Sequence, residues 1–346
     1  MLKKLNVAVV GATGAVGTKM MEKLVERKFP IASIKFLASA RSAGNQIEFN
    51  GETYTIEEAK PESFEGIDIA LFSAGGAVSE ALAPEAAKRG AIVIDNTSHF
   101  RMDPEVPLVV PEVNRHALKT IPKGIIANPN CSTIQMVAAL QPIREKFGLT
   151  KIVVSTYQAV SGSGIAAIEE LRDQSTQWDA GKNVEANVLP VKSDKKHYPI
   201  ARNVIPQIDK FTDNGFTYEE MKMINETKKI MEAPELKVAA TCVRVPVVSG
   251  HSESVYIELA EEATVQQIFD VLKDAPGIVL QDDVTQQVYP MPIFAENEEP
   301  TFVGRIRQDL DNKKGFHLWI VSDNLLKGAA LNSIQIAEAM LEDNLL

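Results

Sequence analysis

Short apolar runs alternate with amphipathic stretches through the first third of the chain. Runs rich in valine and isoleucine predict strands over residues 5–10, 34–37, 67–72 and 91–94. Apolar positions at helical spacing predict helices over residues 15–27 and 79–89. Strands and helices in this alternation form right-handed crossovers and a parallel sheet that is buried on both faces. The pattern therefore predicts an α/β fold with a Rossmann-type doubly wound parallel sheet.

Beyond position 131 the pattern changes to longer strands that are separated by loops. The expected strands cover residues 151–160, 237–248, 254–260, 304–308 and 315–321. This arrangement is typical of a mixed α+β domain. Residues 328–346 again have apolar positions at helical spacing, so we expect this helix to return to the first domain. We predict a first domain over 1–130, completed by a helix at about 325–346, and a second over 131–324.

Composition favours two domains and excludes several functional classes. A chain of 346 residues exceeds the usual size of one core. Its 45% hydrophobic and 24% charged content is that of an ordinary globular protein, and no apolar run is long enough to cross a bilayer. The net charge is −10, with acidic and basic residues interspersed, so we expect no nucleic-acid and no membrane partner.

The cysteines and the N-terminal segment indicate a reducing cytoplasm. Cys131 and Cys242 are too few and too far apart to suggest a disulfide scaffold or a metal site. Lys3 and Lys4 precede an apolar stretch, as in a signal peptide, but this stretch runs into a glycine-patterned loop instead of a cleavage site. We therefore expect a cytoplasmic protein without bound metal.

The first predicted strand leads into a glycine-patterned turn, Gly11-Ala-Thr-Gly14-Ala-Val-Gly17, which opens a helix. Glycine lets the backbone approach a pyrophosphate, and the free N–H groups of a helix N-terminus receive its charge. This placement predicts a dinucleotide site, and the alternative is a tight turn without a ligand. The residues that we expect to contact the cofactor here are Gly11, Thr13, Gly14, Ala15 and Val16.

The end of the second predicted strand indicates which dinucleotide binds. Sites specific for NAD usually carry an Asp or Glu about twenty residues beyond the glycine turn. This chain has Ser39, Arg41 and Ser42 instead. Arg41 with the two serines suits a 2′-phosphate, so we predict NADP over NAD. A solvated surface arginine is the alternative.

Cys131 follows Asn128-Pro-Asn130 and begins a helical pattern. The dipole and free N–H groups at a helix N-terminus favour the nucleophilic thiolate, and they can form an oxyanion hole. His251 is the favoured base, because Ser249-Gly250-His251-Ser252 forms a polar break between two predicted strands. The alternatives are an inert core cysteine and a structural histidine. We interpret Cys242, within an apolar strand, as core.

Four segments together resemble the aspartate-semialdehyde dehydrogenases: residues 11–17, 128–133, 161–164 and 244–251, in the same order and across nearly the whole chain. The resemblance implies NADPH-dependent reductive dephosphorylation of L-4-aspartyl phosphate to L-aspartate 4-semialdehyde and phosphate through a cysteine thioester. This step belongs to lysine, threonine, methionine and diaminopimelate biosynthesis. It also implies a homodimer, with an NADP-binding first domain and a catalytic and dimerisation second domain.

The same resemblance implies a role for each candidate site residue. Cys131 is the nucleophile and His251 the acid/base. For the substrate, Arg244 binds the α-carboxylate, Gln158 orients the carbonyl, Arg101 and Lys222 bind phosphate, and Glu219 binds the ammonium group, with Glu220 as the alternative. For the nicotinamide, the contacts are Ser161, Gly162 and Asn324. Without the resemblance, a solvent-facing strand arginine is the preferred interpretation of Arg244. Arg101 is then consistent with an ordinary surface charge, and Glu219 and Lys222 with a surface salt bridge.

Two related enzymes and one non-catalytic class are the rival interpretations. N-acetyl-glutamyl-phosphate reductase shares the architecture, the Cys/His pair and NADPH, but its substrate has an acylated amine, so Glu219 favours the free amino acid. Glyceraldehyde-phosphate dehydrogenase is disfavoured by the glycine spacing and by the missing acidic residue. A dinucleotide sensor would keep the fold without needing Cys131 and His251 together.

Overall fold

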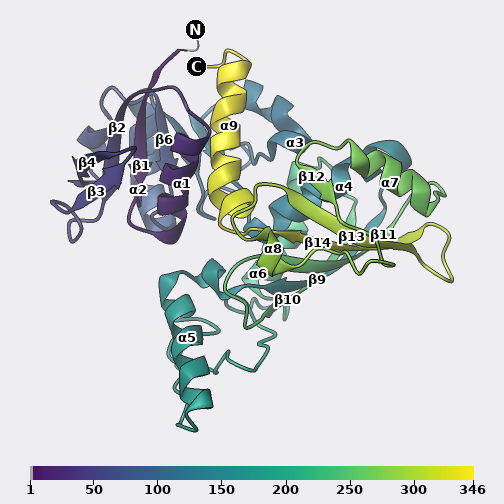
Figure 1. Ribbon diagram of the computed structural model, residues 1–346. Helices are drawn as coiled ribbons and strands as arrows, with labels where there is room; N and C mark the ends of the chain where they lie inside the picture. The colour runs from purple at the N-terminus through teal and green to yellow at the C-terminus, as the bar shows by residue number, and fades with distance from the viewer. Residues whose placement is uncertain (1–2) are drawn as a thin grey trace. The chain divides into compact units, whose positions relative to one another are not determined.

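The computed structural model describes residues 3–346, and the chain forms two compact units (Figure 1). Unit 1 contains the described chain up to Asn130 together with Ala329–Leu346, and unit 2 is Cys131–Gly328. Each unit has its own six-stranded sheet. Within residues 3–346, no helix is both long and apolar enough to span a membrane.

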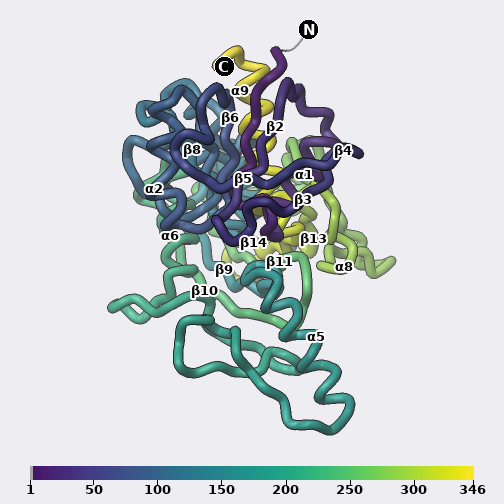
Figure 2. Tube along the Cα trace, turned by 90° about the vertical axis from the view of Figure 1, so that its left-hand side faces the viewer, coloured from purple at the N-terminus to yellow at the C-terminus, as the bar shows by residue number. Residues whose placement is uncertain are grey.

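The main sheet of unit 1 is entirely parallel, in the order β5-β2-β1-β6-β7-β8. Its strands are β1 (Leu5–Val10), β2 (Ile31–Ala38), β5 (Glu57–Glu58), β6 (Ile69–Phe72), β7 (Ile92–Asp95) and β8 (Ile125–Ala127). The strand order reverses at β1, so the crossover helices α1 (Ala15–Glu26) and α2 (Gly76–Lys88) cover opposite faces (Figure 2). All four residues of β6 are buried, as expected for a strand covered on both faces. The predicted fold class is confirmed.

The C-terminal helix α9 (Leu331–Glu342) completes unit 1. It packs on α1, where Arg27 forms two hydrogen bonds with Glu338, of 2.8 and 2.7 Å. Ile334 and Met340 of α9 join the core cluster that contains β1. The remaining elements of this unit are the hairpin β3 (Gln46–Phe49) and β4 (Glu52–Thr55), α3 (Pro111–Asn114), and the 3-10 turns Pro61–Phe64 and Arg115–Lys119.

Unit 2 is built on a mixed sheet in the order β10-β9-β11-β14-β13-β12. The two outer pairs are parallel and the inner pairs are antiparallel. The strands are β9 (Lys151–Gln158), β10 (Lys237–Arg244), β11 (His251–Glu258), β12 (Ile278–Leu280), β13 (Thr301–Gln308) and β14 (Gly315–Ser322). In β9 every second residue is buried, so one face of the sheet carries the core of this unit.

Helices cover the buried face of this sheet. The helices of unit 2 are α4 (Cys131–Phe147), α5 (Ile165–Asp179), α6 (Tyr218–Ile230), α7 (Val265–Lys273) and α8 (Pro292–Ala295), with a 3-10 turn at Val160–Ser163 and a π-helical turn at Leu326–Ala330. Most residues of α4 are buried, since it packs on β11, β13 and β14. α5 extends away from the sheet and packs on its own cluster around Leu171, Leu189 and Ile200 (Figures 1 and 2).

Three predicted strand boundaries in unit 2 are wrong in the same region. β9 ends at Gln158 and β10 at Arg244, earlier than expected, whereas β11 begins at His251, three residues earlier than the expected start at Ser254. His251 is therefore the first residue of a strand and does not lie in a polar break. The sequence pattern misleads here because His251 and Glu253 are polar and yet completely buried.

Candidate active site

Cys131 is the first residue of α4, as the sequence predicts, and its side chain is partly exposed. The first turn of this helix contains no acidic residue, so no negative charge opposes the helix dipole there. Cys242 differs in every respect, because it is fully buried in β10 and burial raises the pKa of its thiol. Of the two cysteines, Cys131 has the environment of a nucleophile.

Gly328, in the π-helical turn, packs directly against Cys131. A Cβ atom at position 328 would lie 2.7 Å from the Cys131 Cβ and 3.1 Å from its Cα. Real Cβ atoms do not approach this closely, so only glycine leaves room for the cysteine in its present position. Turns of this kind are frequent at functional sites.

His251 is completely buried, and its ring orientation is fixed by the backbone. The N–H of Ala159 donates to Nδ1 at 3.1 Å, so the proton of the neutral ring is on Nε2. Burial and the charge of Arg244 lower the pKa of His251 to about 3, with a smaller opposing effect from Glu219. The ring is therefore neutral at physiological pH and presents an N–H donor.

Arg244 is a buried cation beside the histidine and the cysteine. Its guanidinium donates to the Ala159 carbonyl at 2.7 Å and to Ser163 Oγ at 2.9 Å. Burial lowers the pKa of Arg244, whereas the charges of Glu219 and Cys131 raise it, which places the thiolate within electrostatic reach. Gly162 leaves room for the Arg244 and His251 side chains, since a Cβ there would lie 3.1 Å from Arg244 and 3.4 Å from His251.

The side chains of Gln158 and Glu219 meet on the buried face of the sheet. Gln158 Nε2 donates to Glu219 Oε1 at 3.1 Å and lies 3.4 Å from His251 Nε2. Lys222, one turn further along α6, forms ion pairs with Glu219 at 3.3 Å and Asp209 at 2.9 Å. Glu219 is thus held between Gln158 and Lys222.

Glu220 forms hydrogen bonds with backbone N–H groups and not with Gln158. Its carboxylate accepts from the Thr217 N–H at 2.8 Å, which completes a capping box at the start of α6, and from the Cys242 N–H at 3.1 Å. Both oxygens are occupied by backbone donors. Of the two glutamates, Glu219 is the one whose carboxylate lies beside Gln158.

Asn324 and Ser161 form the other end of this cluster. Asn324 Oδ1 accepts from the Gly250 N–H at 3.0 Å, and the amide exchanges hydrogen bonds with Ser161 Oγ at 3.0 and 3.2 Å. Ser161 lies in the 3-10 turn Val160–Ser163, which also contains Gly162. Unit 2 therefore brings together the following predicted residues: Cys131, Gln158, Ser161, Gly162, Glu219, Lys222, Arg244, His251 and Asn324.

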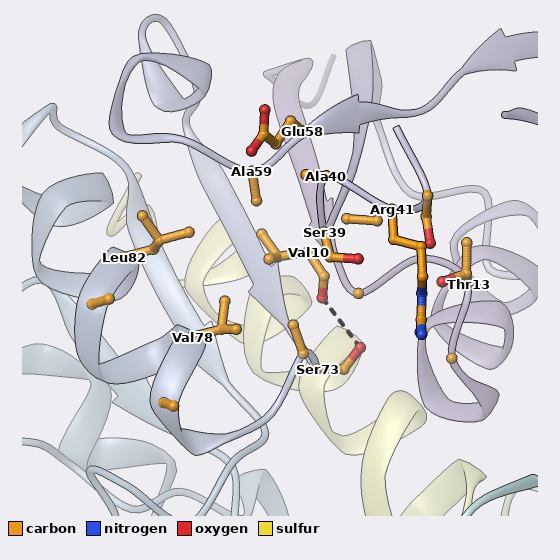
Figure 3. A pocket seen from close by; sticks show the side chains of 17 residues that line it. Val10, Thr13, Ser39, Ala40, Arg41, Glu58, Ala59, Ser73, Val78 and Leu82 are labelled. Atoms are coloured by element: carbon orange, nitrogen blue, oxygen red, sulfur yellow. Dashed lines mark hydrogen bonds between the residues drawn. The ribbon is translucent and has the colours of Figure 1, made fainter. Parts of the chain in front are cut away.

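Unit 1 contains a pocket of about 560 Å³ at the carboxyl ends of its strands (Figure 3). The predicted residues that line it are Gly11, Thr13, Gly14, Ser39, Arg41 and Ser42. A Cβ at Gly11 would meet the backbone of Ser73 at 2.9 Å, and one at Gly17 would meet the Gly11 carbonyl at 2.3 Å. The N-terminus of α1 has no side-chain cap, so its N–H groups are available to a phosphate. These features fit a dinucleotide.

Ala15 and Val16 are the first two residues of α1 and do not line this pocket. Arg41 lies along the pocket beside Thr13, and within residues 3–346 it has no hydrogen bond or ion pair (Figure 3). Glu58 also lines the pocket but lies apart from Arg41 and pairs with Lys60 at 2.6 Å. The sequence did not predict this carboxylate, because β5 has only two residues and therefore no hydrophobic periodicity.

Arg101 belongs to unit 1 and is buried, so it is not the surface charge that its sequence context allowed. Its guanidinium donates to the carbonyls of Asn96 and Asn128 at 3.0 and 2.9 Å. Asn128 is in turn held by Asn96 and Asn332. Arg101 thus braces the segment that leads into Cys131. In the described part of the chain, no group of His, Cys, Asp or Glu side chains has the arrangement of a metal site.

Sequence reasoning also missed Gly328 and Gln135. Gly328 lies at the start of the predicted C-terminal helix. A glycine within an apolar helical pattern often has a packing or functional reason, and this could have indicated its role. Gln135 lies one turn beyond Cys131 in α4, and its amide donates to the His251 carbonyl at 3.3 Å. The position of this polar residue between the apolar residues Ile134 and Met136 could have indicated its role.

Two family models match the chain. The NAD binding domain of semialdehyde dehydrogenase matches residues 6–121, and its dimerisation domain matches residues 140–327. The aspartate-semialdehyde dehydrogenase of Bacillus subtilis (strain 168) is 64% identical over 342 residues, which cover 99% of this chain and 99% of the relative. The chain belongs to the aspartate-semialdehyde dehydrogenase family.

Solved structures of this family have the same fold. Aspartate semialdehyde dehydrogenase II complexed with ASA, from Vibrio cholerae, matches with a TM-score of 0.94 and 46% identity over 99% of both chains. The enzyme with NADP from Candida albicans matches with a TM-score of 0.77 and 25% identity, over 99% of this chain and 100% of the other. The predicted family is confirmed, and with it an oxidoreductase with a Rossmann domain and a dimerisation domain.

Gly328→Ala should displace the nucleophile without unfolding the enzyme. The new methyl group cannot share space with Cys131, so the π-helical turn or the start of α4 must shift. A displacement of about 1 Å at a reacting atom lowers turnover by about 10²-fold, and we expect a loss of this size in kcat. The measurement is steady-state kinetics together with the rate of Cys131 alkylation. An unchanged alkylation rate and kcat, at an unchanged melting temperature, would contradict this role of Gly328.

Proposed function

We propose that this enzyme catalyses the NADPH-dependent reductive dephosphorylation of L-4-aspartyl phosphate to L-aspartate 4-semialdehyde and phosphate, through a thioester on Cys131. The observation that carries the proposal is that Arg244 and His251 both lie against Gly162, while Cys131 is near enough to Arg244 for its charge to raise the Arg244 pKa. Family membership supports it, as do the relatives bound to ASA and to NADP. The step supplies lysine, threonine, methionine and diaminopimelate biosynthesis.

The charges of the cluster suit the three charged groups of the substrate. Arg244 binds the α-carboxylate, since a guanidinium can do so with two parallel hydrogen bonds and this one is already desolvated. Glu219 binds the ammonium group. Lys222 and Arg101 bind phosphate, for which Lys222 must exchange its present carboxylate partners. Each match is needed because an unpaired charge taken out of water is costly.

Cys131 performs the covalent step. Its thiolate attacks the acyl carbon to form a tetrahedral intermediate, the C–O bond to phosphate then breaks, and phosphate leaves while the acyl group stays on Cys131 as a thioester. Gln158 holds the carbonyl oxygen in place, and N–H groups at the start of α4 stabilise the negative oxygen of the tetrahedral intermediate. Splitting the reaction in this way replaces one difficult step by two easier ones.

His251 acts on the oxygen of the substrate carbonyl, where the family resemblance implies an acid/base residue. In the neutral ring the proton is on Nε2, so the Nε2–H donates a hydrogen bond to the thiohemiacetal oxygen and stabilises the negative charge on it before the thiolate leaves. A preorganised donor of this kind contributes about 10²- to 10³-fold in rate. The Ala159 N–H keeps Nε2, and not Nδ1, directed at this task.

The unit 1 pocket binds the cofactor, with the pyrophosphate at the glycine turn and the 2′-phosphate on Ser39, Arg41 and Ser42. Ser161, Gly162 and Asn324 contact the nicotinamide end, and the hydrogen bonds of Asn324 fix this loop. When bound, the nicotinamide supplies the hydride that reduces the thioester.

The assay that tests the function mixes the enzyme with aspartate semialdehyde, phosphate and NADP, and follows the absorbance of reduced nicotinamide. We expect reduction of NADP that depends on phosphate, because phosphate must release the acyl group from Cys131. Cys131→Ser should lower this turnover by at least about 10³-fold, while NADP binding is retained. Turnover with N-acetylglutamate semialdehyde alone would assign the reductase activity instead, and no turnover with either substrate would indicate a non-catalytic sensor.

Arg41→Ala tests the cofactor assignment. Loss of a charge-assisted hydrogen bond to the 2′-phosphate should raise the KM for NADP by about 10- to 100-fold. The KM for NAD should stay within about twofold, because NAD lacks this phosphate. Arg89→Ala, a surface arginine of α2 paired with Glu85, is the matched control. If Arg41→Ala keeps its preference for NADP, the assignment of Arg41 fails.

The enzyme forms a homodimer through the open face of the unit 2 sheet. Val153 and Tyr157, which alternate with the buried residues of β9, are each 38% exposed, and the Tyr157 and Trp319 rings pack 5.5 Å apart. An apolar sheet face of this kind is typical of a protein interface. The match of this segment to a dimerisation domain supports the proposal.

Val153→Asp should shift the protein from dimer to monomer, because a charge would then be buried without a partner in the interface. Sedimentation velocity measures the shift. The matched control is Val25→Asp on α1, since Val25 is 37% exposed but lies in unit 1. A Val153→Asp variant that remains dimeric would exclude this face.

A further inference from the structure

Glu253 is a buried acidic residue to which the mechanism above assigns no role. It lies two residues beyond His251 on β11, and alternate residues of a strand point to the same face of the sheet. Its side chain is completely buried, and neither carboxyl oxygen has a hydrogen bond of standard geometry within residues 3–346. Such a group calls for an explanation, because an ionised carboxylate buried without a partner is very unfavourable.

The polar group that faces Glu253 is the side-chain amide of Gln135. Gln135 lies four residues beyond Cys131 in α4, so both are on the same side of this helix. Its Nε2 donates to the His251 carbonyl at 3.3 Å, whereas its Oε1 is buried without a donor. Gln135 therefore links the helix that carries the cysteine to the strand that carries the histidine.

The unsatisfied oxygens of Glu253 and Gln135 are explained together if Glu253 is protonated. A carboxylate can only accept hydrogen bonds, whereas a carboxylic acid supplies an O–H donor, which the buried Gln135 Oε1 lacks. Burial raises the pKa of Glu253 well above its ordinary range, and Gln135 opposes this only in part. Cys242 on β10 is close enough to be affected by the Glu253 charge, and no cation of the described residues lowers the Glu253 pKa.

We propose that Glu253 is a neutral carboxylic acid that positions Gln135, and through it the His251 backbone relative to Cys131. The Glu253 O–H donates to Gln135 Oε1, which keeps the Gln135 Nε2 directed at the His251 carbonyl. This inference rests on the proposed function, because the relative position of the histidine and the cysteine matters for that chemistry. Glu253 contacts neither substrate nor cofactor, so it is a positioning residue.

Matched substitutions separate positioning from charge. Glu253→Gln keeps a neutral donor of the same size, and its kcat should stay within about threefold of the wild type. Glu253→Leu removes the donor and should lower kcat by about tenfold, with KM for aspartate semialdehyde unchanged within about twofold. Gln135→Leu should give the same loss, and the double variant should lose no more than either single variant. Glu258→Gln, on the same strand but paired with Lys151 and partly exposed, is the control.

Two kinetic results would overturn the proposal. An inactive Glu253→Gln variant would show that the reaction needs an ionised carboxylate at this position. If the kcat of the double variant falls by the product of the two single-variant factors, Glu253 and Gln135 act independently. Wild-type turnover is recorded in the same series, so a failure of the proposed function is recognised separately, as an inactive wild type.

The protonation state can be measured without the reaction. If Glu253 is protonated in the folded state and ionised in the unfolded state, the folded protein binds one more proton above the ordinary carboxyl pKa. Stability then falls as pH rises, and Glu253→Gln removes this loss. We expect the melting temperature of Glu253→Gln, relative to the wild type, to increase from about pH 5 to about pH 8. A difference that stays constant over this range would show that Glu253 is ionised and would overturn the proposal.

Discussion

The backbone of Ala159 is the constraint on which the arrangement of His251 and Arg244 depends. Its N–H donates to Nδ1 of His251, and its carbonyl accepts from the guanidinium of Arg244. One residue thus sets the tautomer of the histidine and the direction of the arginine. Ala159 can do this because β9 ends at Gln158, so its polar groups are free of the sheet ladder and point into the site. No side chain at this position could replace these contacts.

Much of the fold follows from the sequence, because parallel strands buried on both faces are continuous apolar runs. The predicted bounds of β1 agree with the structure, and Cys131 begins its helix as expected. The start of β11 could not be predicted in the same way. His251 and Glu253 are buried by tertiary contacts with α4 and β9, and hydrophobic periodicity does not report such contacts. Glu58 was missed for a related reason, since a two-residue strand has no periodicity.

The choice between Glu219 and Glu220 as the residue of the cluster could have been made from the local sequence alone. Thr217-Tyr-Glu-Glu220 has the spacing of a capping box, in which the fourth residue folds back onto the helix N-terminus. That rule alone assigns Glu220 to the helix start and leaves Glu219 for the cluster. The contact between Glu219 and Gln158, in contrast, joins residues 61 positions apart and needs the structure.

The electrostatics of the cluster change as the proposed reaction proceeds. Arg244 is desolvated, and the nearby charges of Glu219 and Cys131 favour its cationic form. In the proposed reaction the α-carboxylate reaches the guanidinium when the substrate binds, and the charge of the thiolate is lost when the thioester forms. Over the two steps together, one negative charge near Arg244 is therefore exchanged for another. His251, kept neutral by the same arginine, does not add a second cation to this buried site.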